Sequence, residues 1–197
     1  MTTHAPMLIA LYQPAVRWRA IAYRVCWLVA GSLLIAILAQ LAVPLYPVPV
    51  TGQTFAVLLV GAALGPGLGA ATVLLYLLEG SMGLPVFSQG RSGLAMFLGP
   101  TGGYLLGFVV AAAVVGVLAR MGWDRRFWTT MAAMLIGNLV IYCMGLSWLC
   151  MGLGMSLGSS MDVGLYPFIA GDLLKALLAA LILPACWRCL GSRAGHA

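Results

Sequence analysis

The chain has 197 residues, of which 63% are hydrophobic and only 7% are charged. Soluble domains are about 25% charged, so this composition excludes an ordinary soluble protein and indicates a single membrane domain. The formal net charge of +6 does not indicate nucleic-acid binding, because the basic residues of membrane proteins gather on the cytoplasmic side.

The apolar segments are predicted to be helices, because the sequence lacks the short alternating runs of a transmembrane barrel. After an N-terminal tail over residues 1–24, a first span is expected over about 25–43, ended by the prolines of PLYPVPVTGQT. Two short apolar pieces, 55–64 and 68–78, flank the Gly65-Pro66-Gly67 sequence. Each is shorter than a full crossing, so they are expected to be two short buried helices or a re-entrant hairpin.

A long connection follows over residues 81–104, with the sequence SMGLPVFSQGRSGLAMFLGPTGGY. Its glycines and prolines disfavour a continuous helix, and long connections in compact domains are commonly functional. Later spans are predicted over about 104–118, 130–153 and 165–183, with a glycine- and serine-rich turn before the last one. Pro184 is expected to kink or end the last span.

Positive charge determines the predicted orientation. With six segments, the two tails, the turn at 65–67 and the loop at 120–126 lie on one side of the membrane. That side carries most of the basic residues, namely Arg17, Arg19, Arg24, Arg120, Arg125, Arg126, Arg188 and Arg193. The positive-inside rule makes it cytoplasmic, so both termini are predicted to be cytoplasmic. The predicted organisation is a tail over 1–24, a transmembrane domain over 25–187 and a tail over 188–197.

Two ionisable residues, Asp172 and Lys175, lie inside the last predicted span. A charge at the centre of a membrane helix costs about 2.5–3.5 kcal/mol on insertion scales, and such residues commonly face a protein interior and mark function. Their i, i+3 spacing places them on one helix face. They form either a mutually neutralising pair or a ligand site, in which the ammonium pairs with a ligand carboxylate and Asp172 accepts from ligand N–H groups.

Further candidate ligand contacts lie in the two loops that the predicted topology places on the outer side. They are Gln53, Thr54, Phe87, Gln89, Arg91 and Tyr104. The alternative for the polar members is helix capping or solvation, and the alternative for the aromatic members is plain packing. A small-molecule site needs apolar walls with a few polar groups, which this set supplies.

Several kinds of chemistry are disfavoured. The two histidines, His4 and His196, lie in the tails, so no metal site built on histidine and no histidine-based triad is predicted inside the membrane. The P-loop motif GxxxxGK[ST] is missing, so the chain is not expected to hydrolyse ATP through one. Cys186 and Cys189 form a single C-x-x-C pair, which without a second pair or a nearby histidine is predicted to be free thiols.

Four sequence blocks occur in order between residues 38 and 176: VPVTGQTFAVLLVGAALGPGLGA, YLLEGSMGLPVFSQGRSG, FLGPTGGYLLGF and AGDLLKA. Together they closely resemble the biotin transporter BioY family, the substrate-binding S-components of energy-coupling factor (ECF) transporters. The resemblance implies an all-α membrane protein, a six-helix transmembrane bundle with a biotin site near its outer face. It also implies a multi-pass protein of the bacterial inner membrane, with biotin as the transported ligand and no cofactor.

The resemblance maps the family's acidic and basic pair onto Asp172 and Lys175, and a polar loop residue onto Gln89. Arg91 is a second candidate for the biotin carboxylate. The family's small-residue motif, which meets a transmembrane coupling subunit, falls on Ser32 and Ala36, with serine in place of the usual alanine. The implied function is high-affinity biotin binding for uptake, coupled to that subunit and to partner ATPases.

Three alternatives stay open on the sequence. The first is an S-component for another vitamin such as riboflavin or thiamine, against which the ordered blocks argue. The second is an intramembrane enzyme that uses Asp172 as acid or base. The third is a small passive channel. Because the chain lacks an intramembrane histidine and a serine or metal site, it is not expected to be an enzyme.

Overall fold

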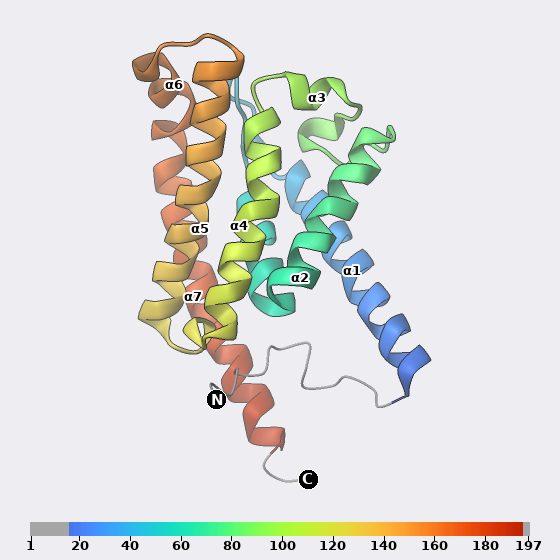
Figure 1. The fold of residues 1–197 in the computed structure, drawn as a ribbon. Coiled ribbons are helices and arrows are strands. Elements are labelled where there is room, and N and C mark those ends of the chain that lie inside the picture. The colour runs from blue at the N-terminus through green and yellow to red at the C-terminus, as the bar shows by residue number, and fades with distance from the viewer. Residues whose placement is uncertain (1–15, 195–197) are drawn as a thin grey trace.

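The computed structural model describes residues 16–194, whose regular secondary structure is helical apart from one short β-hairpin (Figure 1). Within this range, five helices are long and apolar enough to cross a membrane. They are α1 (Arg17–Gln40), α2 (Gln53–Ser81), α4 (Gly102–Arg120), α5 (Phe127–Ser147, continued by the π-helical turn η4, Trp148–Gly152) and α7 (Tyr166–Ala194). The all-α membrane architecture expected from composition is confirmed.

Helix α1 begins at Arg17, well before the expected start of the first span. Arginine is a good helix former, so the basic residues extend the apolar helix instead of preceding it. One side of α1 packs on α2, and the other presents large apolar side chains such as Leu33 and Ile37 to the surroundings. Residues 1–15 of the predicted tail lie outside the described range.

Helix α2 is bent into two arms at Gly65, which has φ 82° and ψ 179° (Figure 1). Pro66 starts the second arm, where its fixed φ and missing N–H are tolerated in a first helical turn. The arms approach closely, since a Cβ on Gly69 would lie only 2.9 Å from the Cα of Gly61. The bend agrees with the prediction of two short apolar pieces separated at residues 65–67.

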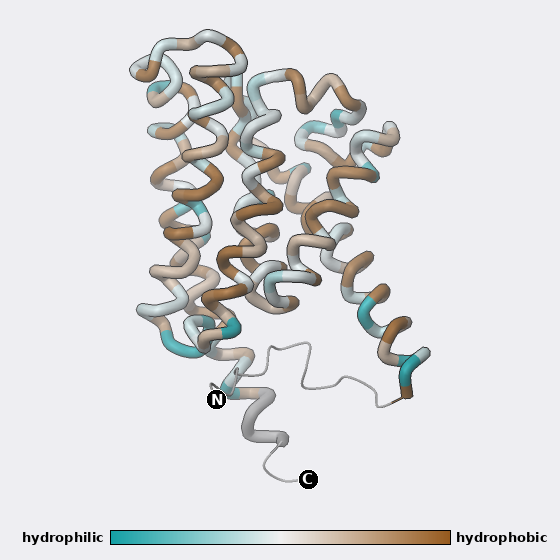
Figure 2. The backbone as a smooth tube through the Cα atoms, viewed as in Figure 1, coloured by the Kyte–Doolittle hydropathy of each residue, from teal (hydrophilic) through white to brown (hydrophobic). Residues whose placement is uncertain are grey.

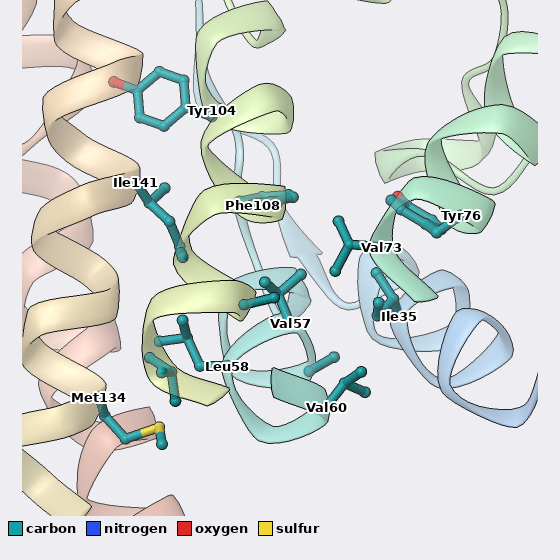
Figure 3. Close-up of a cluster of buried hydrophobic side chains, with 14 of the residues drawn as sticks. Ile35, Val57, Leu58, Val60, Val73, Tyr76, Tyr104, Phe108, Met134 and Ile141 are labelled. Atoms are coloured by element: carbon teal, nitrogen blue, oxygen red, sulfur yellow. The ribbon is translucent and has the colours of Figure 1, made fainter. Parts of the chain in front are cut away.

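The core lies where both arms of α2 meet α1, α4 and α5. Figure 3 shows Val57 and Val73 from the two arms facing Phe108 of α4, with Ile141 of α5 beside it. The bend itself rests on α4, because a Cβ on Gly116 would lie 2.4 Å from the nitrogen of Pro66. Small residues at these crossings let the helix backbones approach closely.

The connection after α1 and the connection after α2 lie at the end of the bundle that holds the cavity described below. The proline-rich segment after α1 forms an antiparallel hairpin of β1 (Ala42–Val43) and β2 (Val50–Thr51). The connection between α2 and α4, residues 82–101, contains the 3₁₀ turn η2 (Ser88–Gly90) and the short helix α3 (Ala95–Leu98). The long connection expected around residues 81–104 is thus folded over much of its length.

Two boundary predictions near the C-terminus are wrong. The expected turn before the last span is the helix α6 (Leu157–Gly164), whose N-cap Ser156 accepts a hydrogen bond from the Ser159 N–H at 3.2 Å. Helix α7 does not end near residue 183 but continues through Pro184 to Ala194. Membrane helices tolerate an internal proline, because neighbouring groups satisfy the backbone that it frees.

Polar residues gather toward the ends of the bundle, and the middle is largely hydrophobic (Figure 2). The start of α1, the turn η3 (Trp123–Arg125) between α4 and α5, and the C-terminal end of α7 lie at the same end (Figure 1). Basic residues dominate that end. The helices between expose large apolar side chains, as a surface facing lipid requires.

Candidate ligand-binding site

A cavity lies at the opposite end of the bundle from the basic segments. Counted with its open side, it holds about 590 Å³ of space free of protein atoms. Six segments supply its walls: the β-hairpin, the start of α2, the α2–α4 connection, α4, α5 and α7. The lining residues are Val48, Pro49, Thr51, Gln53, Thr54, Phe87, Ser88, Arg91, Met96, Thr101, Tyr104, Leu105, Phe108, Ile141, Tyr142 and Phe168.

Aromatic rings form much of the apolar wall, and their positions are fixed. Phe87 is only 1% exposed and makes edge-on contacts with Tyr76 and Phe97, at ring-centroid distances of 5.5 and 5.9 Å. Tyr104 stacks on Phe168 at 6.3 Å, and its hydroxyl donates to the Gly164 carbonyl at 2.8 Å. A rigid aromatic wall of this kind suits a flat, apolar ligand body.

Asp172 and Lys175 form an ion pair behind one wall of the cavity. Asp172 is 2% exposed, and the Lys175 Nζ donates to its Oδ1 at 2.7 Å. The same ammonium donates to the Thr51 carbonyl at 2.6 Å and to the Thr54 Oγ1 at 3.0 Å. An ammonium has three donors, so these three contacts occupy all of them.

The carboxylate of Asp172 orients two hydroxyls that line the cavity. Thr54 Oγ1 donates to Asp172 Oδ1 at 2.9 Å, and the Tyr142 hydroxyl donates to Oδ2. A hydroxyl that donates to a carboxylate keeps oxygen lone pairs for other donors, and the charge polarises it. The network therefore presents oriented hydrogen-bond acceptors at this wall, suited to ligand N–H groups.

A second polar network connects the start of α2 to the α2–α4 connection. Gln53 Nε2 donates to the Tyr76 hydroxyl at 2.5 Å, while its Oε1 accepts from the Thr51 hydroxyl at 3.0 Å. The Tyr76 hydroxyl in turn donates to the Val86 carbonyl at 3.1 Å. Both ends of the Gln53 amide are thus held by the protein, which fixes its orientation at the cavity wall.

Arg91 is the charged side chain among the described residues that line the cavity. Its Nη2 donates to the Gln89 Oε1 at 3.4 Å, and the residue is otherwise exposed. Ser88 is 6% exposed, and its Oγ has no hydrogen-bond partner within residues 16–194. A buried hydroxyl without a partner is costly, so Ser88 is poised to bond a ligand.

The structure brings Gln53, Thr54, Phe87, Arg91 and Tyr104 together around one cavity, as the sequence analysis grouped them. Asp172 and Lys175 contribute from behind its wall. Gln89 is exposed, with the unusual φ of 61° for a non-glycine residue, and its side chain contacts Arg91 instead of the cavity.

The two residues expected to meet a partner subunit lie on α1, away from the cavity. Ser32 is 0% exposed, and its hydroxyl donates to Glu79 of α2. Ala36 is partly buried one turn further along. Ser32 therefore faces α2 in this structure.

Sequence reasoning missed Tyr142, although a signal for it existed. Its hydroxyl occurs in the middle of an otherwise apolar span, where a polar group needs a partner. Thr51 and Ser88 carried no comparable signal, because loop residues of their type are common. Among the described residues, no group of three histidine, cysteine, aspartate or glutamate side chains is placed to hold a metal ion.

A helical membrane protein whose bundle holds a cavity lined by aromatic rings and a few polar side chains belongs to the class of membrane-embedded small-molecule binders. The comparison with protein families is more specific. Residues 12–192 match the BioY family, so this chain belongs to that family.

Similar proteins with assigned names agree with this membership. The probable biotin transporter BioY of Pyrococcus horikoshii is 40% identical over 145 residues, covering 73% of this chain and 83% of the relative. The biotin transporter BioY of Thermotoga maritima is 40% identical over 149 residues, covering 76% and 86%. The crystal structure of the S-component for biotin from an ECF-type ABC transporter superposes with a TM-score of 0.76 at 26% identity, covering 89% of this chain and 95% of that one.

Proposed function

We propose that this protein binds biotin in the cavity described above and serves in biotin uptake. The names of its relatives and of the similar crystal structure support this function. The observation that carries it is the composition of the cavity lining, which combines one arginine, hydroxyl acceptors held by Asp172 and several aromatic rings. These relatives are transporters by name, which supports neither an enzyme nor a riboflavin or thiamine carrier.

The chemistry of biotin fits this composition. Its ureido group carries N–H donors, which Thr54 and Tyr142 are oriented to accept. Its bicyclic body is apolar and suits the walls formed by Phe87, Tyr104 and Phe168. Its carboxylate needs a cation or strong donors at the other end of the cavity.

We assign the carboxylate to Arg91, with the hydroxyl of Ser88 as a second donor. Arg91 lines the cavity, and its planar guanidinium suits a carboxylate. Lys175, the other candidate from the sequence, already donates to three protein oxygens and lines a second, smaller cavity with Asn138. Its part in the site is then to hold Asp172 and Thr54 in place.

The test compares biotin with biotin methyl ester, which lacks the charge. Arg91→Ala is expected to weaken biotin binding about 10- to 150-fold, since a hydrogen bond to a charged group contributes about 1.5–3 kcal/mol. The ester should bind the variant and the parent equally. Leu94→Ala, an exposed change in the same connection, is the matched control. Unchanged biotin affinity of Arg91→Ala, measured in detergent, would exclude the assignment.

A second variant examines the ureido end. Tyr142→Phe keeps the ring and removes the hydroxyl that bonds Asp172. One lost hydrogen bond of about 0.5–1.5 kcal/mol predicts a roughly 2- to 12-fold weaker affinity, equal for biotin and its ester. If Tyr142→Phe instead weakens the binding of biotin and of its methyl ester to different extents, Tyr142 lies near the carboxylate and biotin is bound in the orientation opposite to the one proposed.

For the membrane arrangement, we propose six spanning or partly spanning helices, counting the two arms of α2 separately. The first arm, Gln53–Leu64, is about 18 Å long at 1.5 Å per residue, short of the roughly 30 Å hydrocarbon core. The end that carries Arg17, Arg120 and Arg188 is assigned to the cytoplasm of a bacterial inner membrane. The cavity then opens outward, and both termini are cytoplasmic.

Uptake against a gradient needs an energy source, and the sequence has no P-loop. We propose that a transmembrane coupling subunit and ATPase subunits supply it, as the ECF-type transporter of the similar structure suggests. The exposed face of α1 near Ala36 is the proposed contact. Vesicles that contain the purified chain alone should bind biotin but accumulate none with ATP inside. Accumulation by the chain alone would argue against the need for partners.

A further inference from the structure

Gln40, the last residue of α1, makes hydrogen bonds with both sides of the turn formed by residues 86–91. Its Nε2 donates to the Phe87 carbonyl at 3.2 Å and, more weakly, to the Val86 carbonyl at 3.5 Å. Its Oε1 accepts from the Gly90 N–H at 2.9 Å. One side-chain amide thus joins the end of α1 to a segment far along the chain.

That turn supplies one wall of the cavity. Phe87, Ser88 and Arg91 line it, and the turn is closed internally by the Phe87 N–H donating to the Arg91 carbonyl at 3.0 Å. At the first residue of the turn, the Val86 carbonyl accepts a hydrogen bond from the Tyr76 hydroxyl of α2. Gln40 therefore bonds the turn from the side of α1, and Tyr76 bonds it from α2.

The neighbouring parts of the connection are held to α2 by a few backbone hydrogen bonds. The Leu84 N–H donates to the Glu79 carbonyl at 3.1 Å and the Gly93 N–H donates to the Gly80 carbonyl at 2.8 Å, while the Met82, Leu84 and Leu94 side chains are exposed. A segment held by few contacts opens at a lower free-energy cost than the helical core. The carboxamide of Gln40 is the side-chain link from α1 that restrains such opening.

We propose that Gln40 is a positioning residue that holds the turn 86–91 closed over the cavity, and that ligand exchange requires release of this contact. The role in biotin exchange rests on the proposed function. Because α1 packs mainly on α2 and on this turn, a displacement of the end of α1 would break the Gln40 contacts and leave the turn held from the α2 side alone. A movement of α1 would thereby change the access of ligand to the cavity.

The first experiment measures biotin dissociation with radiolabelled biotin and an excess of unlabelled biotin. Gln40→Ala removes the hydrogen bonds with Phe87 and Gly90, each of which contributes about 0.5–1.5 kcal/mol. The dissociation rate of biotin should therefore increase at least about fivefold, and the association rate should not decrease. Gln40→Glu keeps the acceptor for Gly90 but places a carboxylate oxygen against the Phe87 carbonyl, so it should also accelerate dissociation. Ile37→Ala, on the exposed face of α1 at 65% exposure, should leave both rates unchanged. Unchanged dissociation in Gln40→Ala overturns the proposal.

The second experiment needs no biotin, so it separates this inference from the proposed function. Ser88 is replaced by cysteine in a variant whose native cysteines are alanine, and its modification by a membrane-impermeant maleimide is timed. Because Ser88 is buried, modification reports opening of the turn. Adding Gln40→Ala should increase the rate at least about fivefold, and adding Ile37→Ala should not. Equal rates with and without Gln40→Ala overturn the proposal, whatever the ligand proves to be.

Discussion

The Asp172–Lys175 pair makes the sharpest stability prediction. Asp172→Leu leaves an ammonium beside Thr51 and Thr54 without a counter-charge, and it removes the acceptor of two hydroxyls. Breaking a buried ion pair by removing one partner costs about 3–5 kcal/mol. With roughly 2–4 °C per kcal/mol for a chain of this size, Tm in detergent should fall by about 6–20 °C.

Removing the second charge should reverse part of that loss. In the double variant Asp172→Leu with Lys175→Met, no unpaired ammonium remains, so the double variant should be about 2 kcal/mol more stable than Asp172→Leu alone. Its biotin affinity should stay low, because Thr54 and Tyr142 lose the carboxylate that orients them. If Lys175→Met instead adds its own destabilisation to that of Asp172→Leu, the pair is not coupled and the reasoning fails.

Two further predictions concern packing and pH. Gly80→Ala places a Cβ about 2.2 Å from the Phe87 ring, so it should lower the free energy of unfolding by about 1–3 kcal/mol and weaken biotin binding. The control is Gly67→Ala, whose Cβ meets no atom within 4 Å and which should therefore be tolerated. Thermal unfolding and biotin binding are measured for both variants. Burial raises the pKa of Asp124, which accepts from Trp187, above its usual 3.8. A raised pKa makes the folded state bind the proton more tightly, so stability is greatest when Asp124 is protonated and falls as pH rises through the folded-state pKa. The Tm of the parent relative to Asp124→Asn should therefore rise as the pH is lowered toward 3.8, and a constant difference would contradict this.

Much of the fold could be predicted from the sequence because membrane helices obey strong constraints. A run of apolar residues must be helical in lipid, and Gly65-Pro66-Gly67 interrupts such a run in a way that a straight helix does not tolerate. The boundaries were less predictable. Arginine residues are good helix formers, so Arg17 to Arg24 belong to α1 although they look like a tail in the sequence. Pro184 lacks the N–H of a regular helical residue, yet α7 continues through it.

The candidate site was predictable where burial of a charge demanded an explanation. Asp172 and Lys175 stood out because an unpaired charge in lipid is costly, and their pairing follows from the same cost. Five of the candidates, Gln53, Thr54, Phe87, Arg91 and Tyr104, do line the cavity, but which candidates would lie behind its wall was not predictable. The sequence offers Lys175 as a partner for a ligand carboxylate and Thr54 as a ligand contact or a helix cap, and only the packing of α7 against α2 places the hydroxyl in the wall and the ammonium behind it.

The pairing of Asp172 and Lys175 with Thr51 and Thr54 also bears on how the chain is made. These contacts join residues 118 to 124 positions apart, so the partners in α7 are synthesised last. Before α7 docks, the Thr54 hydroxyl and the Thr51 carbonyl have to form hydrogen bonds with each other or with water inside the incomplete bundle. Helix α7 in turn carries two charges into the bilayer, where an isolated charge costs about 2.5–3.5 kcal/mol. The two charges can pair with each other within α7, but they meet the oxygens of Thr51 and Thr54 only when the helix docks. Completion of the cavity and stable insertion of the last helix are therefore one event, late in biosynthesis.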